Sequence, residues 1–183
     1  MIKKFLFCSL VFSLGITTSF AQTDKGVSKL EDPDNLASQY FSQVMGVALD
    51  ATSNVKLYKF VYEWIGTPYK FAGNTRKGID CSAFTKAIYE KVFNTTIARN
   101  SAQIFNMVNP LSKTELKEGD LVFFKIKSKS INHIGLYLGE NKFAHASQSR
   151  GVVIDNLNDP YYSRYFFKGG KILEKANQGI ITE

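Results

Sequence analysis

The chain has 183 residues, a formal net charge of +7, and a composition that is 44% hydrophobic and 14% aromatic. This length fits one domain with a small appendage, and the aromatic content excludes an intrinsically disordered chain. Two cysteines are too few for a disulfide-dense scaffold or a four-thiolate zinc site.

The first 21 residues have the pattern of a secretory signal peptide. Lys3 and Lys4 precede an apolar run over residues 5–16, and residues 19–21 (Ser-Phe-Ala) form a small–x–small cleavage site. The apolar run is shorter than the roughly 20 residues that a membrane span needs. We therefore expect cleavage after Ala21, export to the periplasm or the extracellular space, and no stable membrane insertion afterwards.

Cleavage changes the charge and the cysteine count. It removes two lysines and no acidic residue, so the net charge falls from +7 to +5. A basic chain outside the cytoplasm favours an anionic wall or envelope polymer as partner over nucleic acid. Cys8 leaves with the signal peptide, and Cys81 remains without an intramolecular partner. An odd cysteine in an exported protein indicates an intermolecular disulfide or a reactive thiol.

Apolar residues at helical spacing predict several helices in the first part of the mature chain. The predicted helices are 36–48 with Asp34 or Asn35 as N-cap, 53–65 with Ser53 as N-cap, a third that begins at Asp80, and a short one over 101–108. Gly66 and Pro68 end the second helix, and residues 73–78 form a loop by composition.

Beyond Gly119 the pattern changes to short apolar runs between turn signals. The predicted strands are 121–124, 133–138, 142–146, 151–155 and 166–173. Because helices come first and strands second, we predict an α+β fold with an antiparallel sheet.

Cys81 lies in the first turn of the third helix, directly after its predicted N-cap. Free backbone N–H groups and the positive end of the helix dipole favour thiolate over thiol, so we expect a lowered pKa for Cys81. The same N–H groups could hold an oxyanion. The alternative is a small buried apolar side chain, which is the commoner role of a lone cysteine.

A thiolate nucleophile needs a base and an orienting partner, and the mature chain offers His133 and His145. They fall on successive strands of one predicted hairpin. An odd connection of three residues, 139–141, places both rings on one face of the sheet. An even connection places them on opposite faces unless a bulge intervenes. Taken singly, each histidine is more simply explained as structural.

The same three side chains could instead bind a catalytic zinc ion. A cysteine at a helix start is unusual for such a site, and no Asp or Glu lies at a recognisable ligand spacing nearby. We therefore expect nucleophilic catalysis without a metal or another cofactor.

Several motifs, taken in order, resemble successive blocks of the NlpC-type (NlpC/p60) cell-wall peptidases, a family of papain-like cysteine peptidases. The matching blocks are residues 66–69 (Gly-Thr-Pro-Tyr), 78–82, 119–124, 132–139, 143–147 and 159–162. The resemblance covers about residues 53–175. It divides the chain into a signal peptide (1–21), a linker and helix (22–52), a peptidase domain (53–175) and a tail (176–183), similar to the compact single-domain branch.

The resemblance implies a papain-like fold, with the N-terminal helices packed on the sheet, and hydrolysis of an amide bond in a peptidoglycan stem peptide. Cys81 would be the nucleophile, His133 the base and His145 its orienting partner. Tyr69, Asp80 and Ser82 match positions that the family uses to stabilise the oxyanion or bind substrate. Helix capping alone would also explain Asp80, and packing would explain Tyr69. The resemblance implies no cofactor, and we expect a monomer.

Three departures from the family pattern leave every catalytic group in place: Ala83 replaces Gly, Glu118 replaces Pro and Asn132 replaces Ser. The scissile bond stays open between the D-glutamyl–diamino acid link and the interpeptide crosslink. The alternatives are an amidase that cuts the glycan–peptide link, an acyltransferase, and a non-catalytic wall-binding protein in which Cys81 forms an intermolecular disulfide.

Overall fold

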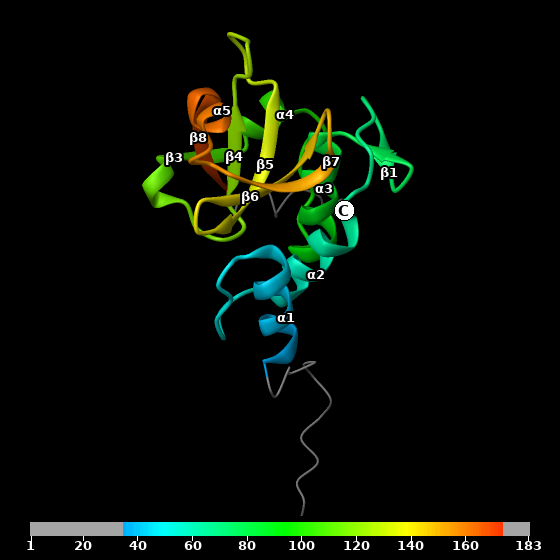
Figure 1. Cartoon of the computed structure of the whole chain (residues 1–183). Coiled ribbons are helices and arrows are strands. Elements are labelled where there is room, and N and C mark those ends of the chain that lie inside the picture. The colour runs from blue at the N-terminus through cyan, green and yellow to red at the C-terminus, as the bar shows by residue number, and fades with distance from the viewer. Residues whose placement is uncertain (1–34, 174–183) are drawn as a thin grey trace, which may run out of the picture. The chain divides into compact units, whose positions relative to one another are not determined.

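The computed structural model describes residues 35–173 (Figure 1). The predicted signal peptide, the first part of the linker with Asp34, and the predicted tail lie outside these residues. Within residues 35–173, no helix is both long enough and apolar enough to cross a membrane.

The described chain begins with helices and ends mainly in strands. The helices are α1 (Leu36–Met45), α2 (Val55–Trp64), α3 (Cys81–Val92), α4 (Ser101–Phe105), a 3₁₀ turn η1 (Lys113–Glu115) and α5 (Pro160–Tyr165). The strands are β1 (Asn74–Thr75), β2 (Gly78–Ile79), β3 (Val108–Leu111), β4 (Leu121–Phe124), β5 (His133–Gly139), β6 (Lys142–Ser147), β7 (Gly151–Asn156) and β8 (Phe166–Ile172).

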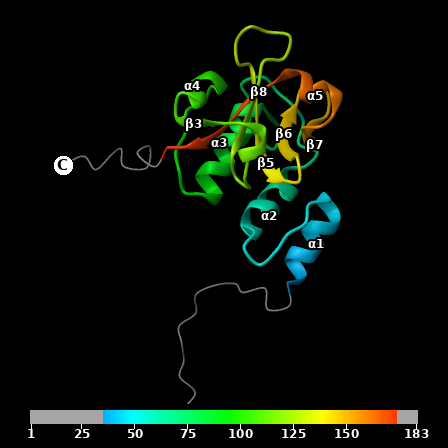
Figure 2. The same ribbon diagram turned by 90° about the vertical axis from the view of Figure 1, so that its left-hand side faces the viewer.

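Six strands form one sheet in the order β3-β8-β4-β5-β6-β7, and every neighbouring pair is antiparallel. Helix α3 packs on β5 and β6, α2 packs on α3, and α1 packs on α2. Figures 1 and 2 show α1 and α2 side by side in both views. The prediction of an α+β fold with N-terminal helices on an antiparallel sheet is confirmed.

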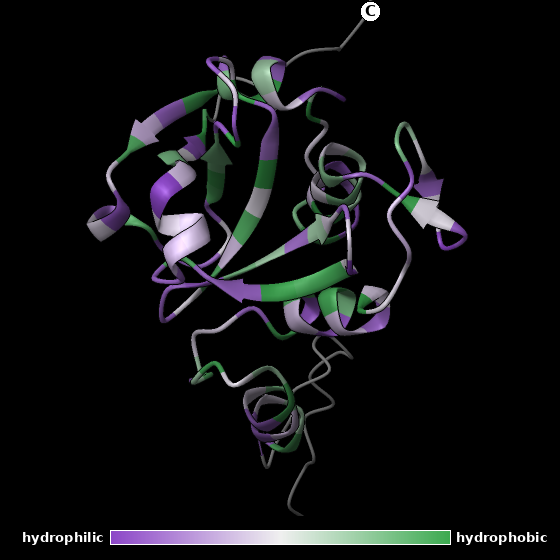
Figure 3. Cartoon of the chain, turned by 45° about the horizontal axis from the view of Figure 1, so that its top comes forward, coloured by the Kyte–Doolittle hydropathy of each residue, from purple (hydrophilic) through white to green (hydrophobic). Residues whose placement is uncertain are grey.

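The sheet is buried on both faces, because alternate side chains of each strand enter different clusters. One face contacts the helices and includes Phe123, Ile134 and Leu136. The other face includes Phe124 and Phe143, and α5 covers it through Tyr162. Figure 3 shows hydrophobic residues concentrated along the strands. The second face is the one that bears both histidines, since His133 contacts Phe124 and His145 stacks on Phe143.

Several predicted boundaries were wrong. Helix α1 ends at Met45 because Gly46 takes up a left-handed conformation with φ +62°, which closes the helix before residues 47 and 48. The N-cap of α2 is Asn54, whose side chain accepts a hydrogen bond from Leu57 N–H, and not Ser53. The helix predicted over 101–108 ends at Phe105.

Three kinds of element were not predicted. Strand β3 was not predicted, and its first residue, Val108, was assigned to a helix; β1 and the first residue of β2 were assigned to a loop, and α5 was missed. Short elements such as these show too few repeats for a period to be recognised. Helix α5 nevertheless had a local signal, since Asp159 caps it and Pro160 occupies its first turn.

Two of the departures from the family pattern stabilise the fold. The Glu118 carboxylate accepts hydrogen bonds from Asn54 N–H (2.9 Å) and the Tyr58 hydroxyl (2.8 Å), which ties the start of α2 to the turn before β4. The Asn132 side chain accepts from Ile126 N–H and donates to Ile126 C=O, both at 2.8 Å, which closes the loop that precedes His133.

Candidate active site

Cys81 is the first residue of α3, as predicted. Asp80 caps the helix and accepts a hydrogen bond from Ala83 N–H at 2.8 Å. Cys81 is 9% exposed, and its thiol lies against the backbone N–H of Ile134, the residue after His133. The helix start and the first residues of β5 therefore meet at the thiol.

The expected direction of the Cys81 pKa shift was wrong. Burial raises the pKa of the thiol to about 11, and the nearby Asp80 carboxylate acts in the same direction. Backbone N–H groups of Ile134, Ser82 and Cys81 itself oppose this shift but do not outweigh it. Local helix chemistry points to a thiolate, whereas burial, which depends on the whole fold, keeps the resting sulfur as a thiol.

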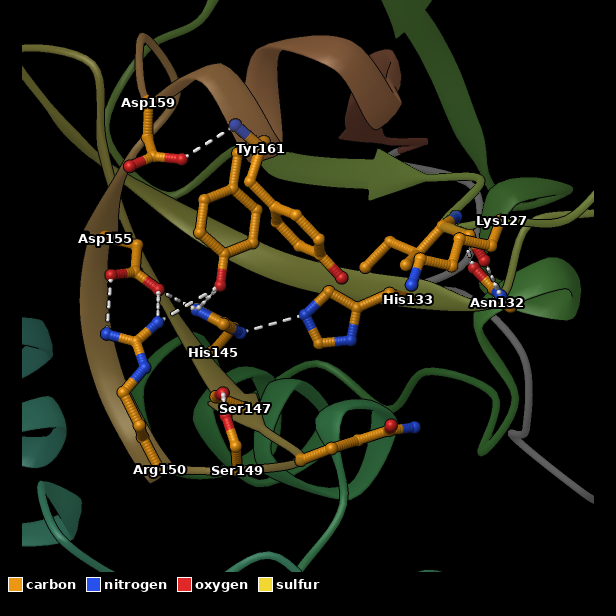
Figure 4. A pocket seen from close by; sticks show the side chains of 13 residues that line it. Lys127, Asn132, His133, His145, Ser147, Ser149, Arg150, Asp155, Asp159 and Tyr161 are labelled. Atoms are coloured by element: carbon orange, nitrogen blue, oxygen red, sulfur yellow. Dashed lines mark hydrogen bonds and ion pairs between the residues drawn. The ribbon is translucent and has the colours of Figure 1, made fainter.

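The structure brings His133 and His145 into direct contact. Their rings meet through His133 Nε2 and His145 Nδ1 at 2.8 Å (Figure 4). Gly139 pairs with Lys142, so the turn between the strands has two residues, Glu140 and Asn141, and the connection is even. Both turn residues have positive φ, as in the common two-residue hairpin turns. A shift of register between Tyr137 and Gly139 adds one residue to β5 and returns both rings to one face. The connection is therefore even and not odd, and a bulge in β5 keeps both histidine rings on the same face of the sheet.

A second set of polar side chains holds the far side of His145. His145 Nε2 lies 2.8 Å from a carboxylate oxygen of Asp155 and 3.3 Å from the Tyr162 hydroxyl. Arg150 donates to both oxygens of Asp155, at 3.0 and 2.5 Å (Figure 4). The sequence analysis gave no role to Asp155 or Arg150, and it included Tyr162 only within the matching block 159–162.

Both imidazoles are neutral in the resting site. His133 is 7% exposed and His145 is 1% exposed. Burial lowers the pKa of His133 well below its usual value, and the positive charge of a protonated His145 would lower it further. Burial also lowers the pKa of His145, although Asp155 opposes this effect. A neutral imidazole is a general base ready to accept a proton.

Tyr69 lies close to the nucleophile on the segment before β1. Backbone bonds from Lys70 N–H to Ile79 C=O (3.2 Å) and from Ile79 N–H to Pro68 C=O (3.0 Å) hold this segment beside the chain that leads into α3. Burial raises the pKa of the Tyr69 phenol, and a negative charge on Cys81 would raise it further. Tyr69 therefore keeps its proton and can donate a hydrogen bond beside Cys81.

Asp80 and Ser82 come together with a residue that the sequence analysis missed. Arg99 donates to both Asp80 oxygens at 2.8 Å and to the Ser82 hydroxyl at 2.7 Å. Burial is the largest single effect and opposes ionisation of Asp80, but the hydrogen bonds from Arg99, Ala83 N–H and Ser82 and the charge of Arg99 together outweigh it and lower the pKa of the carboxyl. A buried charge is normally paired, but the burial of Asp80 follows from the whole fold, so the sequence carried no local signal for Arg99.

A pocket of about 640 Å³ opens over the histidine side of the site. Its lining combines His133 and His145 with Asp155 of β7, with Tyr161 of α5 and with loop residues that include Lys127, Gln148 and Arg150 (Figure 4). Across residues 35–173, no group of three or more His, Cys, Asp or Glu side chains is arranged to hold a metal ion.

Gly135 allows the two hairpin strands to approach at the histidine pair. A Cβ atom at this position would lie 2.7 Å from the Phe143 ring, 2.9 Å from the Ala144 carbonyl oxygen and 3.2 Å from His145 Cβ. We expect Gly135→Ala to lower the free energy of unfolding by about 1–3 kcal/mol, because the backbone of β6 must move. Urea unfolding of the full chain measures this, and an unchanged midpoint would contradict it.

A sequence model of the NlpC/P60 family matches residues 66–171, which is more than half of the chain and contains the capped cysteine and both histidines. The chain belongs to the NlpC/P60 family. Its α+β architecture agrees with that of solved members. The crystal structure of an NlpC/P60 family protein from Bacillus cereus superimposes with a TM-score of 0.60 and 30% identity, covering 69% of this chain and 42% of that one.

Two curated relatives extend the comparison. A probable endopeptidase NlpC homolog of Haemophilus influenzae is 40% identical over 111 residues, which is 61% of this chain and 58% of the relative. A murein DD-endopeptidase/murein LD-carboxypeptidase of Escherichia coli K12, MepS, is 35% identical over 114 residues, or 62% of this chain and 60% of the relative. The matched region therefore spans about three fifths of each of these relatives.

Proposed function

We propose that this member of the NlpC/P60 family is an exported cysteine peptidase that hydrolyses an amide bond in peptidoglycan stem peptides. The observation that carries the proposal is the meeting of Cys81, at a capped helix start, with the strand that begins with His133, which is bonded to His145. The names of the relatives, a murein endopeptidase and a probable endopeptidase, support the substrate class and the reaction.

In the proposed mechanism His133 removes the Cys81 proton as the sulfur attacks the scissile carbonyl carbon. The carbonyl oxygen becomes an oxyanion, held by N–H groups at the start of α3 and by the Tyr69 hydroxyl. The C–N bond then breaks, and the leaving amine takes the proton from His133. Water, deprotonated by His133, attacks the acyl-enzyme; the C–S bond breaks, and the proton returns to sulfur.

The remaining parts of the proposal concern organisation and location. Residues 1–21 act as a cleaved signal, residues 22–52 as a linker and helix, residues 53–175 as the peptidase domain and residues 176–183 as a tail. The protein is then periplasmic or extracellular and acts on the wall as a monomer. The basic mature chain suits an anionic polymer as substrate.

Digestion of purified muropeptides tests the reaction. The mature protein is incubated with muropeptides, and the products are identified by mass spectrometry against a blank without protein. Two peptide fragments indicate an endopeptidase, and a free glycan with an intact stem indicates an amidase. Transfer of the acyl group to an added amine in preference to water indicates an acyltransferase. No product, together with a disulfide-linked dimer on a non-reducing gel, would exclude the catalytic proposal.

The pH profile tests the neutral resting pair. His133 acts as a base only when unprotonated, so activity appears as pH rises through its pKa. Because burial lowers that pKa, we expect the acid limb of kcat/KM to lie below pH 6.5. Activity should not wait for ionisation of the thiol, whose pKa is about 11. Activity that rises only in parallel with thiol ionisation, above pH 8, would contradict this scheme.

A further inference from the structure

We propose that Asp155 is a positioning residue that fixes the tautomers of His145 and His133, so that the unprotonated nitrogen of His133 is Nδ1, the one free to serve Cys81. The inference rests on the proposed function for its kinetic consequences, but its structural content is independent of activity. Asp155 touches neither the thiol nor His133 directly, and it acts through His145.

Asp155 is held as a carboxylate by the geometry around it. Arg150 donates to both of its oxygens, and a hydroxyl–carboxylate bond from Tyr162 adds a third donor. Burial opposes ionisation of Asp155, but the bonds from His145, Arg150 and Tyr162 outweigh it and keep the pKa well below the usual range of a carboxyl. An ionised carboxylate can accept hydrogen bonds but cannot donate them.

The direction of each bond in the chain then follows. Since Asp155 only accepts, the 2.8 Å contact requires that His145 Nε2 carries the hydrogen and donates it. A neutral imidazole has one N–H, so His145 Nδ1 has a free lone pair. That nitrogen lies 2.8 Å from His133 Nε2, which must therefore donate. The lone pair of neutral His133 is left on Nδ1.

Protonation of the wrong nitrogen would disable the base. With the opposite tautomers, His145 would donate from Nδ1, His133 would accept at Nε2, and His133 Nδ1 would already carry a hydrogen. Asp155 also contributes charge, because its carboxylate stabilises the imidazolium that forms when His133 takes the thiol proton. The same carboxylate raises the pKa values of both histidines, against the larger effect of burial.

Other charged and titratable groups face the His133–His145 pair from several elements. Arg150, in the turn before β7, lies beside Asp155 and opposes protonation of His145. Tyr162 of α5 contacts His145 Nε2, and Lys127 and Asp159 line the same pocket from two loops. Compared with these groups, Asp155 makes the shorter contact with His145 Nε2, at 2.8 Å. We therefore attribute control of the His145 tautomer to Asp155.

Nitrogen-15 NMR of the histidine rings in the wild-type mature protein tests the assignment directly. We expect His133 to be protonated at Nε2 and unprotonated at Nδ1, and His145 to be protonated at Nε2, at a pH above both pKa values. Protonation of His133 at Nδ1 would overturn the proposal, whether or not the protein cleaves peptidoglycan. This measurement needs no variant, so misfolding of a mutant cannot obscure it.

Asp155→Asn tests the consequence. Arg150 attracts the amide oxygen, so the NH₂ group turns to His145 and the tautomers reverse. We expect kcat to fall by about 10²- to 10³-fold with little change in KM, less than the roughly 10⁴-fold effect of the directly bonded Asp in serine-protease triads. The acid limb of kcat/KM should move to lower pH, because a stabilising negative charge is lost. Asp155→Glu, which keeps the charge, should recover part of the activity.

Asp50→Asn is the matched control, since it removes the same charge from an exposed carboxylate in the loop between α1 and α2. We expect wild-type kinetics from it. The rate of Cys81 alkylation by iodoacetamide, measured against pH in all four proteins, gives a readout that needs no substrate. An unchanged acid limb and unchanged ring tautomers in folded Asp155→Asn would show that Asp155 has only a structural role.

Discussion

Cys81→Ala is expected to reduce muropeptide hydrolysis by at least about 10⁴-fold while the protein stays folded. The proposed mechanism forms a bond between the sulfur and the substrate carbonyl carbon, and alanine offers no atom for that bond. The Asp80 cap and its bond to Ala83 N–H do not involve the cysteine side chain, so α3 should still form. Initial rates of fragment release, followed by chromatography, measure the loss.

The control for this variant lies at the opposite end of the same helix. Lys91 is exposed in the last turn of α3, and Lys91→Ala should change neither the rate nor the unfolding midpoint appreciably. Cys81→Ser, which keeps a weaker nucleophile in the same place, should retain little activity. Near-normal turnover by Cys81→Ala would exclude covalent catalysis at this residue.

The parts of the fold that the sequence predicted are those encoded locally. Asp80 is a capping residue directly before an apolar helical pattern, so the position of Cys81 at the helix start followed from a few neighbouring residues. The strands of the second half were recognised because each is a short apolar run between turn signals. The same local signals placed His133 and His145 on one hairpin.

The missed parts depend on contacts between distant segments. Arg99 pairs with Asp80 across 19 residues, and Tyr162 reaches His145 across 17. Asp155 faces His145 because β6 and β7 pair in one particular register. No local period or cap encodes such meetings. The predicted lowering of the Cys81 pKa was wrong for the same reason. The effect of the helix start is local, whereas burial of the thiol is set by the packing of α3 against β5.

The length of the connection between β5 and β6 did not by itself decide whether His133 and His145 share one face of the sheet, because β5 contains a bulge. The number of residues between the two histidines shows whether their rings lie on the same face only when the turn length and the strand register are both known. The pairing of Gly139 with Lys142 leaves a two-residue turn, and the register shift after Tyr137 compensates for it. Contact between the two rings is therefore a property of the folded hairpin.

His133→Ala and His145→Gln are expected to differ in kind. His133 is the proposed base, and within residues 35–173 His145 is the other histidine, already bonded to Asp155 on its far side. His133→Ala should therefore lower kcat by about 10⁴-fold or more. In His145→Gln the side-chain oxygen can still accept from His133 Nε2, so the orientation survives and we expect a loss of only about 10- to 100-fold.

The comparison of the two variants assigns the roles, because each change removes one imidazole of the same buried pair. Both rings pack against aromatic side chains, His133 on Phe124 and His145 on Phe143, so both variants should lose some stability. Rates must therefore be measured well below each variant's own unfolding temperature. An inactive His145→Gln beside an active His133→Ala would reverse the assignment and make His145 the base. Equal losses in both would mean that the pair acts as one unit in proton transfer.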